Sequence, residues 1–418
     1  MPGWKTAAYD LIKRHPLLRL QVRRLLGAFR SARYRLRSAG VPVEERTVLF
    51  CAYHGAHCTC SPRAIYDEMA AAPEYRDYRF LWAVKDPSAH PDLAAAPRTE
   101  LVRFGGADFE RAMARAGTWV FNSTLPEHIS PRRGQRYLQC WHGTPLKRLG
   151  FDIQDDGNVM NSPAEIRRRY RLEARKITWF LSPSPFASAC FRSAWHLDGG
   201  RVLELGYPRN DRLARAAEAD CAAARAALGI PPGRRAVLYA PTFRDDEHVS
   251  GEGYACRPAV DFARLREQLG EGYVILFRAH YLVASAFDFD ALGGFVRDVS
   301  AVEDINDLYL AADLLVTDYS STMFDYAVLR RPILFYMYDL ERYRDRLRGF
   351  YFDPEELPGR LLRREEELAG AICAAERFVW TEEWEAFRRR FAPLEDGHAA
   401  RRVIEAVFGK EEDHGMEG

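Results

Sequence analysis

His142 is the strongest candidate for chemistry in this sequence. An apolar run over residues 136–140 predicts a short strand, and the histidine follows it on a loop with a glycine. Pro145 predicts the start of a helix, and Lys147 and Arg148 would follow within its first two turns. A ring that titrates near neutral pH beside two cations is typical of a base that acts on an anionic substrate. In the alternative interpretation, the histidine is buried in a turn and the two cations are simply solvated.

Polar clusters follow three apolar runs in the second half of the chain. The clusters are Pro241-Thr-Phe-Arg-Asp-Asp246, Arg278-Ala-His280 and Thr317-Asp-Tyr-Ser-Ser-Thr322. Because parallel strands end at one edge of a sheet, these clusters would line one crevice. Two arginines, a histidine and several hydroxyl groups at that edge predict a site for a phosphate or a nucleotide.

The third cluster also predicts a helix start. Ser320, Ser321 or Thr322 would cap the helix, and Asp325 would complete a capping box with Thr322. The free N–H groups of such a start suit a phosphate. In the alternative, the serines are only a cap, and the charged residues after the other two strands form surface ion pairs or merely end a strand.

Strand and helix patterns alternate along most of the chain, which predicts parallel sheets covered on both faces. The expected strands are 47–52, 80–84, 118–122, 136–140, 179–181 and 202–205, then 236–239, 274–277, 314–317 and 333–336. The expected helices are 62–71, 108–116, 164–176, 262–269, 304–312 and 322–329. An Ala- and Arg-rich segment over 211–233 marks a hinge. We therefore expect an N-terminal segment (1–40), two sheet domains (41–210 and 211–390) and a C-terminal helix with a tail (391–418).

Composition narrows the class of protein. A chain of 418 residues favours two domains, and a net charge of +1 argues against a dedicated nucleic-acid binder. Eight scattered cysteines favour free thiols in a reducing compartment. With no apolar run of membrane-spanning length and no signal peptide, we expect the protein to stay in the cytoplasm. The dinucleotide fingerprint G-x-G-x-x-G and the P-loop are both absent, and no metal or cofactor is predicted.

The first 40 residues hold ten Lys or Arg and one acid, Asp10. Leucines and other apolar residues between positions 17 and 29 fall roughly on one side of a helix, and arginines take much of the rest. Such a helix can lie in the headgroup layer of an anionic membrane. The alternative is a capping helix whose leucines belong to the core.

The loop Tyr53-His-Gly-Ala-His-Cys-Thr-Cys60 follows the first expected strand. Its two histidines and two cysteines could hold zinc, but one residue between the cysteines is not the usual spacing of two. A loop that faces the substrate is the favoured interpretation.

Several segments together resemble the CDP-glycerol glycerophosphotransferase family of teichoic-acid primases and polymerases. They include Ser61-Pro-Arg-Ala-Ile-Tyr66, Trp141-His-Gly-Thr-Pro-Leu-Lys-Arg-Leu-Gly150, Gly206-Tyr-Pro-Arg-Asn-Asp211, Tyr239-Ala-Pro-Thr-Phe-Arg-Asp-Asp246, Arg278-Ala-His280, Thr317-Asp-Tyr-Ser-Ser321, Phe324-Asp-Tyr326 and Arg348-Gly-Phe-Tyr351. The resemblance covers roughly residues 47 to 408. It implies an α/β fold of glycosyltransferase-B type: two Rossmann-like, doubly wound domains that face each other across a cleft, with a C-terminal helix that crosses back.

The resemblance also implies residue roles. His142 matches the general base and His280 a second essential histidine near the pyrophosphate. Contacts with a cytidine-diphosphate polyol match Arg209, Phe243, Arg244, Arg278, Ser320 and Ser321, and the predicted substrate-binding set further includes Gly143, Thr144, Pro145, Leu146 and Asp325. Phe243 stands where the family most often has tryptophan, and the loop with His54 and His57 departs from the usual version.

The predicted reaction moves glycerol phosphate from CDP-glycerol to an acceptor hydroxyl and releases CMP. The expected acceptor is a polyprenyl-diphosphate-linked glycan or a growing polyol-phosphate chain, which places the enzyme at the cytoplasmic face of the membrane. Two alternatives remain open: a CDP-ribitol or other nucleotide-linked donor, and a non-catalytic module that binds envelope polymer.

Overall fold

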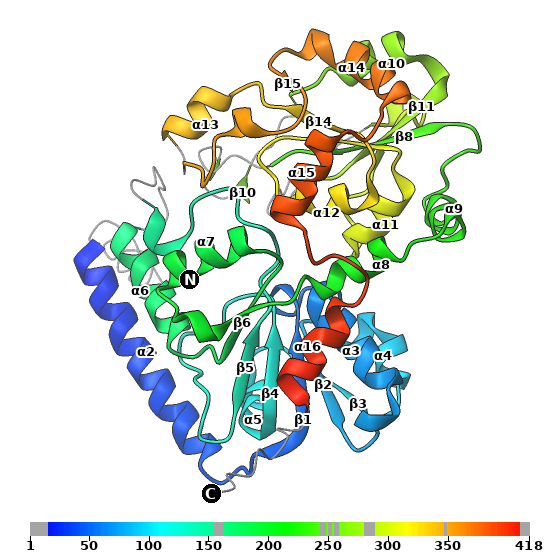
Figure 1. Cartoon of the computed structure of the whole chain (residues 1–418). Helices are drawn as coiled ribbons and strands as arrows, with labels where there is room; N and C mark the ends of the chain where they lie inside the picture. Colours follow the sequence, from blue (N-terminus) through cyan, green and yellow to red (C-terminus); the bar gives the residue numbers. More distant parts are fainter. Residues whose placement is uncertain are drawn as a thin grey trace, which may run out of the picture.

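Two parallel sheets, each with helices on both faces, form two lobes of the molecule (Figure 1). The computed structural model describes residues 16–153, 162–242, 248–249, 253–254, 259–279, 289–346 and 349–409. The first lobe is defined here by the sheet of β1 to β7, and the second lobe by the sheet of β8 and β11 to β15.

The first sheet has seven strands in the order β3-β2-β1-β4-β5-β6-β7. They are Glu44–Cys51 (β1), Arg79–Val84 (β2), Thr99–Arg103 (β3), Ala116–Phe121 (β4), Arg136–Gln139 (β5), Trp179–Ser182 (β6) and Val202–Glu204 (β7). The helices around it are Cys60–Ala71 (α3), Pro91–Ala95 (α4), Gly106–Arg115 (α5), Pro163–Ala174 (α6) and Pro185–Trp195 (α7). The central strands are buried on both faces, which explains their continuous apolar runs.

The second sheet has six strands in the order β12-β11-β8-β13-β14-β15. They are Arg235–Ala240 (β8), Tyr273–Phe277 (β11), Val296–Asp298 (β12), Leu314–Thr317 (β13), Ile333–Tyr336 (β14) and Leu361–Leu362 (β15); His248–Val249 (β9) and Gly253–Tyr254 (β10) pair separately. The helices of this part are Glu218–Ala227 (α9), Phe262–Leu269 (α10), Ile305–Ala311 (α11), Thr322–Tyr326 (α12), Leu340–Arg346 (α13), Leu368–Ala374 (α14) and Glu382–Phe391 (α15).

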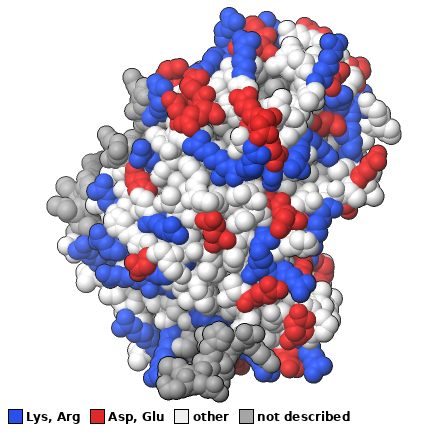
Figure 2. Space-filling model, viewed as in Figure 1, with Lys and Arg blue, Asp and Glu red and all other residues white. Residues whose placement is uncertain are grey.

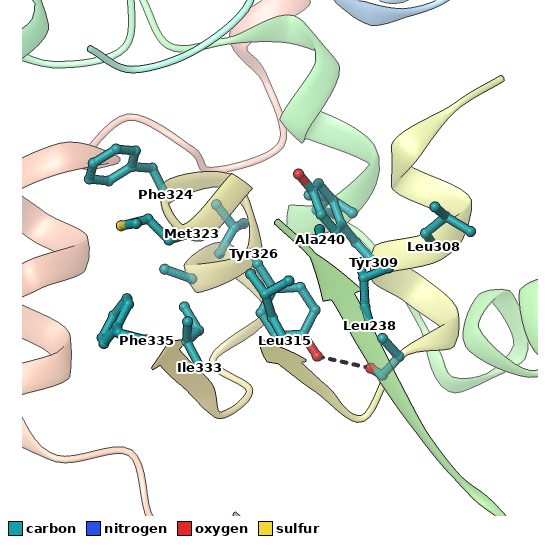
Figure 3. Close-up of a cluster of buried hydrophobic side chains, with 14 of the residues drawn as sticks. Leu238, Ala240, Leu308, Tyr309, Leu315, Met323, Phe324, Tyr326, Ile333 and Phe335 are labelled. Carbon is teal, nitrogen blue, oxygen red and sulfur yellow. Dashed lines mark hydrogen bonds between the residues drawn. The ribbon is translucent and has the colours of Figure 1, made fainter. Parts of the chain in front are cut away.

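One core cluster holds α11 and α12 against the second sheet (Figure 3). Leu238 of β8 and Leu315 of β13 meet Leu308 of α11 and Met323 of α12, and all four are fully buried. The hydroxyl of Tyr326 donates to the carbonyl of Ala312 at 3.0 Å. This packing fixes the start of α12 at the carboxyl end of β13.

The chain passes between the lobes twice. It leaves the first lobe through Pro208–Asn210 (η6) and Asp211–Ala214 (α8), and it returns with Ala399–Phe408 (α16), which packs against α3 (Figure 1). Val403 of α16 is buried in the core of the first lobe. The carboxylate of Asp211 accepts the N–H groups that open α16, each at 2.8 Å, so the two crossings are joined to each other.

The N-terminal helix Pro16–Ser38 (α2) lies against the first lobe (Figure 1). Arg33 and Arg37 donate to the buried carboxylate of Glu110 on α5 at 2.9 and 3.0 Å, and Tyr34 is buried beside them. In the part of the chain that the structure describes, no helix combines the length and apolarity needed to cross a bilayer.

The expected pair of parallel α/β sheets is confirmed. Every strand and helix that was given a residue range from the sequence is present within a few residues, and the end of the last of these helices is a 3-10 turn, Ala327–Leu329. The sequence analysis missed β3, β12 and β15 at the sheet edges, where strands are short or partly exposed. It also missed the helices α4, α7 and α13, and helices α8 and α9 lie in the segment that was expected to be a hinge.

Candidate active site

His142 lies at the end of β5 with its two ring nitrogens in different environments. Nδ1 is 2.7 Å from the backbone carbonyl of Asn122, at the end of the neighbouring strand β4. A carbonyl only accepts hydrogen bonds, so Nδ1 carries the proton and Nε2 keeps its lone pair. Trp141, at φ +50, stacks its ring 4.4 Å from the imidazole and limits its rotation. The ring is held as a proton acceptor.

The surrounding protein lowers the pKa of His142 to about 4, although the residue taken as a whole is exposed to solvent. The main cause is loss of hydration around the imidazole, and the nearby guanidinium of Arg209 acts in the same direction. The hydrogen bond to Asn122 opposes this shift but does not cancel it. The imidazole is therefore neutral at physiological pH.

The loop after His142 touches the second lobe directly. A Cβ atom on Gly143 would lie 2.4 Å from Oγ of Ser321, at the start of α12, so any other residue here would force Ser321 to shift. Thr144 and Pro145 are buried in the same loop. The structure therefore brings the candidate base and the predicted phosphate-binding helix start to one place.

The helix expected from Pro145 is wrong. The chain instead continues extended into the second lobe, where Lys147 forms a bridge with Phe350 and the carbonyl of Leu146 accepts from the N–H of Tyr351 at 2.9 Å. Leu146 is buried in the core of the second lobe, and its contact with the substrate stays a prediction. Pairing with the second lobe replaces the expected helix, because it satisfies the backbone N–H and C=O groups that a helix would otherwise have bonded.

The three strand ends of the second sheet share one edge, as expected for parallel strands. The backbone N–H of Arg278 donates to Tyr239, and its guanidinium donates to the carbonyl of Val302 at 2.8 Å. Burial lowers the pKa of Arg278, which nonetheless stays far above neutrality for a guanidinium. Asp318 accepts the N–H of Thr242 at 2.8 Å and so ties two of these ends together.

The predicted capping box at α12 is also wrong. Ser321 is the residue before the helix and makes no side-chain cap, and the hydroxyl of Ser320 instead accepts weakly from the N–H of Thr322 at 3.4 Å. Asp325 faces away from this helix start. It pairs with Arg209 from the first lobe at 2.8 Å, and both side chains are buried. The Asp325 carboxylate that was expected to complete the capping box is therefore used in the ion pair with Arg209.

Arg209 and Asp325 were expected to contact the substrate, and the structure shows them in contact with each other. Asn210 adds a third hydrogen bond to Asp325 at 3.0 Å, and the amide of Asn306 donates to the carbonyl of Arg209 at 2.7 Å. The guanidinium also lies 4.0 Å from the ring of Tyr207. Together these groups form a polar junction between the lobes.

Tyr53 and Asn122 are parts of the site that the motifs did not single out. Tyr53 has φ +49, and its backbone N–H donates to Oδ1 of Asn122 at 2.8 Å. Its ring lies 5.9 Å from that of His142, and its hydroxyl hydrogen-bonds with Cys60. Asn122 thus orients both the imidazole and the loop over it. The sequence signal that could have identified Asn122 is a polar residue directly after a buried strand.

The loop with the four candidate zinc ligands contacts the second lobe instead. The backbone N–H of Cys58 donates to Glu303 at 2.6 Å, and the His57 ring is 3.8 Å from the same carboxylate. Among the described residues, no three His, Cys, Asp or Glu side chains are grouped as a metal site would need. Phe243, Arg244 and His280 lie outside the described residues.

Comparisons with known proteins agree with this geometry. Residues 33–409 match the family described as CDP-Glycerol:Poly(glycerophosphate) glycerophosphotransferase. The chain is 36% identical over 369 residues to the teichoic acid glycerol-phosphate transferase of Staphylococcus aureus (strain NCTC 8325 / PS 47), which covers 87% of this chain and 93% of that protein. It is 38% identical over 376 residues to the teichoic acid poly(glycerol phosphate) polymerase of Bacillus subtilis (strain 168), across 89% of this chain but only 50% of that relative's length.

Solved structures of other proteins share the fold of this chain. A structure of the wall teichoic acid polymerase TagF is 32% identical and superposes with a TM-score of 0.81, over 95% of this chain and 97% of that one. A UDP-N-acetylglucosamine 2-epimerase from Listeria monocytogenes superposes with a TM-score of 0.51 at 13% identity, over 88% of this chain and 98% of that one. That second likeness concerns the fold alone.

Proposed function

Because the chain belongs to the CDP-glycerol:poly(glycerophosphate) glycerophosphotransferase family, we propose that it transfers glycerol phosphate from CDP-glycerol to a hydroxyl group of a teichoic-acid acceptor. The observation that carries the proposal is the neutral imidazole of His142 with its free Nε2, held beside the start of α12. This arrangement pairs a proton acceptor with a place for the phosphates of the donor.

In the proposed reaction, Nε2 of His142 takes the proton of the acceptor hydroxyl. The oxygen then forms a bond to the β-phosphorus of CDP-glycerol, and the bond between that phosphorus and the bridging oxygen breaks. CMP leaves with the bonding electrons. Positioning of the acceptor next to the phosphorus supplies a large share of the rate enhancement.

Negative charge grows on the leaving CMP phosphate. We assign its stabilisation to Arg278 and to the hydroxyl and N–H groups at Ser320 and Ser321, which lie on the sheet edge nearest to the base. His280, Phe243 and Arg244 remain predicted donor contacts on the basis of their motifs. The buried pair of Arg209 and Asp325 is proposed to hold the lobes at the spacing that this transfer needs.

The test is the His142→Ala variant. It should bind CDP-glycerol with normal affinity and lose about 10²- to 10⁴-fold in the rate of CMP release, the usual contribution of a general base. CMP release is measured with a synthetic lipid-linked acceptor, and CDP-ribitol serves as the second donor. Undiminished CMP release by the variant would overturn the role of His142, and faster turnover of CDP-ribitol would reassign the donor.

We further propose that α2 places the enzyme on an anionic membrane surface where a polyprenyl-linked acceptor resides, at the cytoplasmic face. The face of α2 that carries Tyr34 and Ser38 is held on the first lobe, and the opposite side exposes Leu25, Phe29 and Leu36 at 71%, 68% and 79% of their surface. Leu25, Phe29 and Leu36 do not belong to the core, which favours membrane contact over a capping helix. Arginines flank the apolar stripe, as in helices that lie in headgroup layers.

A further inference from the structure

A cavity of about 330 Å³ lies at the junction of the two lobes. Its walls come from α3 and α16 of the first lobe, from η6 and α8 between the lobes, and from the start of α11 in the second lobe. Figure 2 shows basic and acidic side chains next to each other on the face over α3 and α8. Among the described residues, Arg209 is the one predicted donor contact that lines this cavity.

A layer of side chains separates the cavity from the base. Cys60 and Arg209 form part of the cavity wall, and Tyr53 lies behind them with its hydroxyl on Cys60 and its ring beside His142. Arg209 is fixed in this wall by Asp325. A ligand in the cavity would therefore be distinct from a donor bound beside His142.

The lining is rich in both charges. It contains four arginines and four acidic residues, so it offers guanidinium donors and carboxylate acceptors in equal number. Arg63 is held by Asp67 at 2.8 Å, whereas Arg215 forms no ion pair within the described part of the chain. Such a lining suits a ligand that has hydroxyl groups as well as a phosphate, because a bare polyanion would meet as many repulsive groups as attractive ones.

Two further observations point to a ligand. Oδ1 of Asn306 has no hydrogen-bond partner among the residues that the structure describes, although Asn306 is only 4% exposed and lines the cavity. Such a buried acceptor costs free energy unless a donor reaches it. In addition, α3 begins at the cavity wall with no side-chain cap and no acidic residue in its first turn, which leaves N–H groups for an anion.

We propose that this cavity is a second binding site, separate from the donor site, for a polyol phosphate. The phosphate would lie between Arg63, Arg215 and the start of α3, and the hydroxyl groups would donate to Asn306 and Asp67. Free glycerol 3-phosphate and a unit of a poly(glycerol phosphate) chain share this chemistry. Because residues of both lobes line the site, its ligand would also favour the lobe arrangement seen here.

Calorimetric titration of the full chain with glycerol 3-phosphate, and with a synthetic glycerol-phosphate oligomer, tests the proposal in the presence of saturating CDP. We expect saturable binding that CDP does not displace and that His142→Ala does not alter. Tighter binding of the oligomer would assign the site to the polymer, and equal binding would assign it to the free polyol phosphate.

Two variants remove the site by different routes. The double variant Arg63→Gln with Arg215→Gln removes charge, and Ala64→Phe fills the cavity from α3. Each should weaken binding about ten-fold or more. The double variant loses charge-assisted contacts with the phosphate, and the phenylalanine of Ala64→Phe occupies the space of the ligand. Arg76→Gln and Ala71→Phe are exposed controls that should bind like the wild type.

The proposal is wrong if no saturable binding occurs, if CDP competes, or if both site variants bind normally. Because no turnover is measured, none of these outcomes bears on the transfer reaction.

Discussion

At the scale of single residues, the tautomer of His142 depends on a backbone carbonyl 20 positions earlier in the chain. That carbonyl belongs to Asn122, and it fixes the tautomer whatever side chain Asn122 carries. The side chain of the same residue holds the backbone of Tyr53. One position thus serves the base through its main chain and the neighbouring loop through its amide.

The lowered pKa of His142 predicts an unusual pH profile for kcat/KM. The base is active when neutral, so activity persists as the pH falls through 6.5 and is lost only toward a pKa of about 4. Between pH 7.5 and 5.5 the value should change by less than about two-fold, whereas a histidine of ordinary pKa would lose roughly ten-fold.

The measurement is CMP release at limiting donor, with circular dichroism at each pH as a control for folding. An inflection near pH 6.5 would mean that the imidazole is hydrated in the free enzyme, contrary to the environment described here.

At the scale of elements, the loop after β5 and the start of α12 set the distance between the lobes. Gly143→Ala should therefore reduce kcat by about ten-fold or more with a small change in melting temperature, because the new Cβ would collide with Ser321 and displace the base from the phosphate site. Gly272→Ala is the matched control, since nothing lies within 4 Å of a Cβ there. Steady-state kinetics with CDP-glycerol decide the matter, and normal turnover by Gly143→Ala would show that this contact does not set the site.

Helix α2 carries its own prediction. The triple variant Leu25→Ser, Phe29→Ser and Leu36→Ser should lose most of its binding to phosphatidylglycerol vesicles, because each buried apolar side chain contributes roughly 1.5–3 kcal/mol. Val379→Ser removes an equally exposed apolar side chain from another part of the surface and should have no effect. Co-sedimentation with vesicles measures the difference, and equal sedimentation of the triple variant and the wild type would contradict a membrane role for this stripe.

At the scale of the whole molecule, the two lobes are joined by polar contacts on one side and by main-chain pairing on the other. The first set is centred on Arg209 and Asp325, and the second set links residues 146–149 to residues 349–351. The crossing of α16 back onto α3 adds an apolar contact. These three connections fix how the base faces the second sheet.

Asp325→Asn should destabilise the protein by about 3–5 kcal/mol, because the guanidinium of Arg209 would stay buried without a counter-charge. The double variant Arg209→Met with Asp325→Leu should recover much of that loss, since it removes both charges together. Urea denaturation followed by fluorescence gives the free energies. If the single variant were as stable as the wild type, the pair would not be a structural junction.

The sequence carried enough information to predict both sheets and their central strands, because a strand buried on both faces must be continuously apolar. It also indicated His142, Arg278 and the serines after β13, because polar residues after buried strands meet at one edge. Short edge strands such as β15 lack that signal, since two residues cannot show a pattern.

The sequence by itself determined which residue types stand at the ends of the strands, and hence the family and the candidate base. Only the tertiary structure decided what each one touches. Arg209 and Asp325 pair with each other, Leu146 enters the core of the opposite lobe, and Pro145 opens no helix. The physical reason is that contacts between the lobes join residues far apart in the chain, and their energies exceed the local preferences from which helices and caps are predicted.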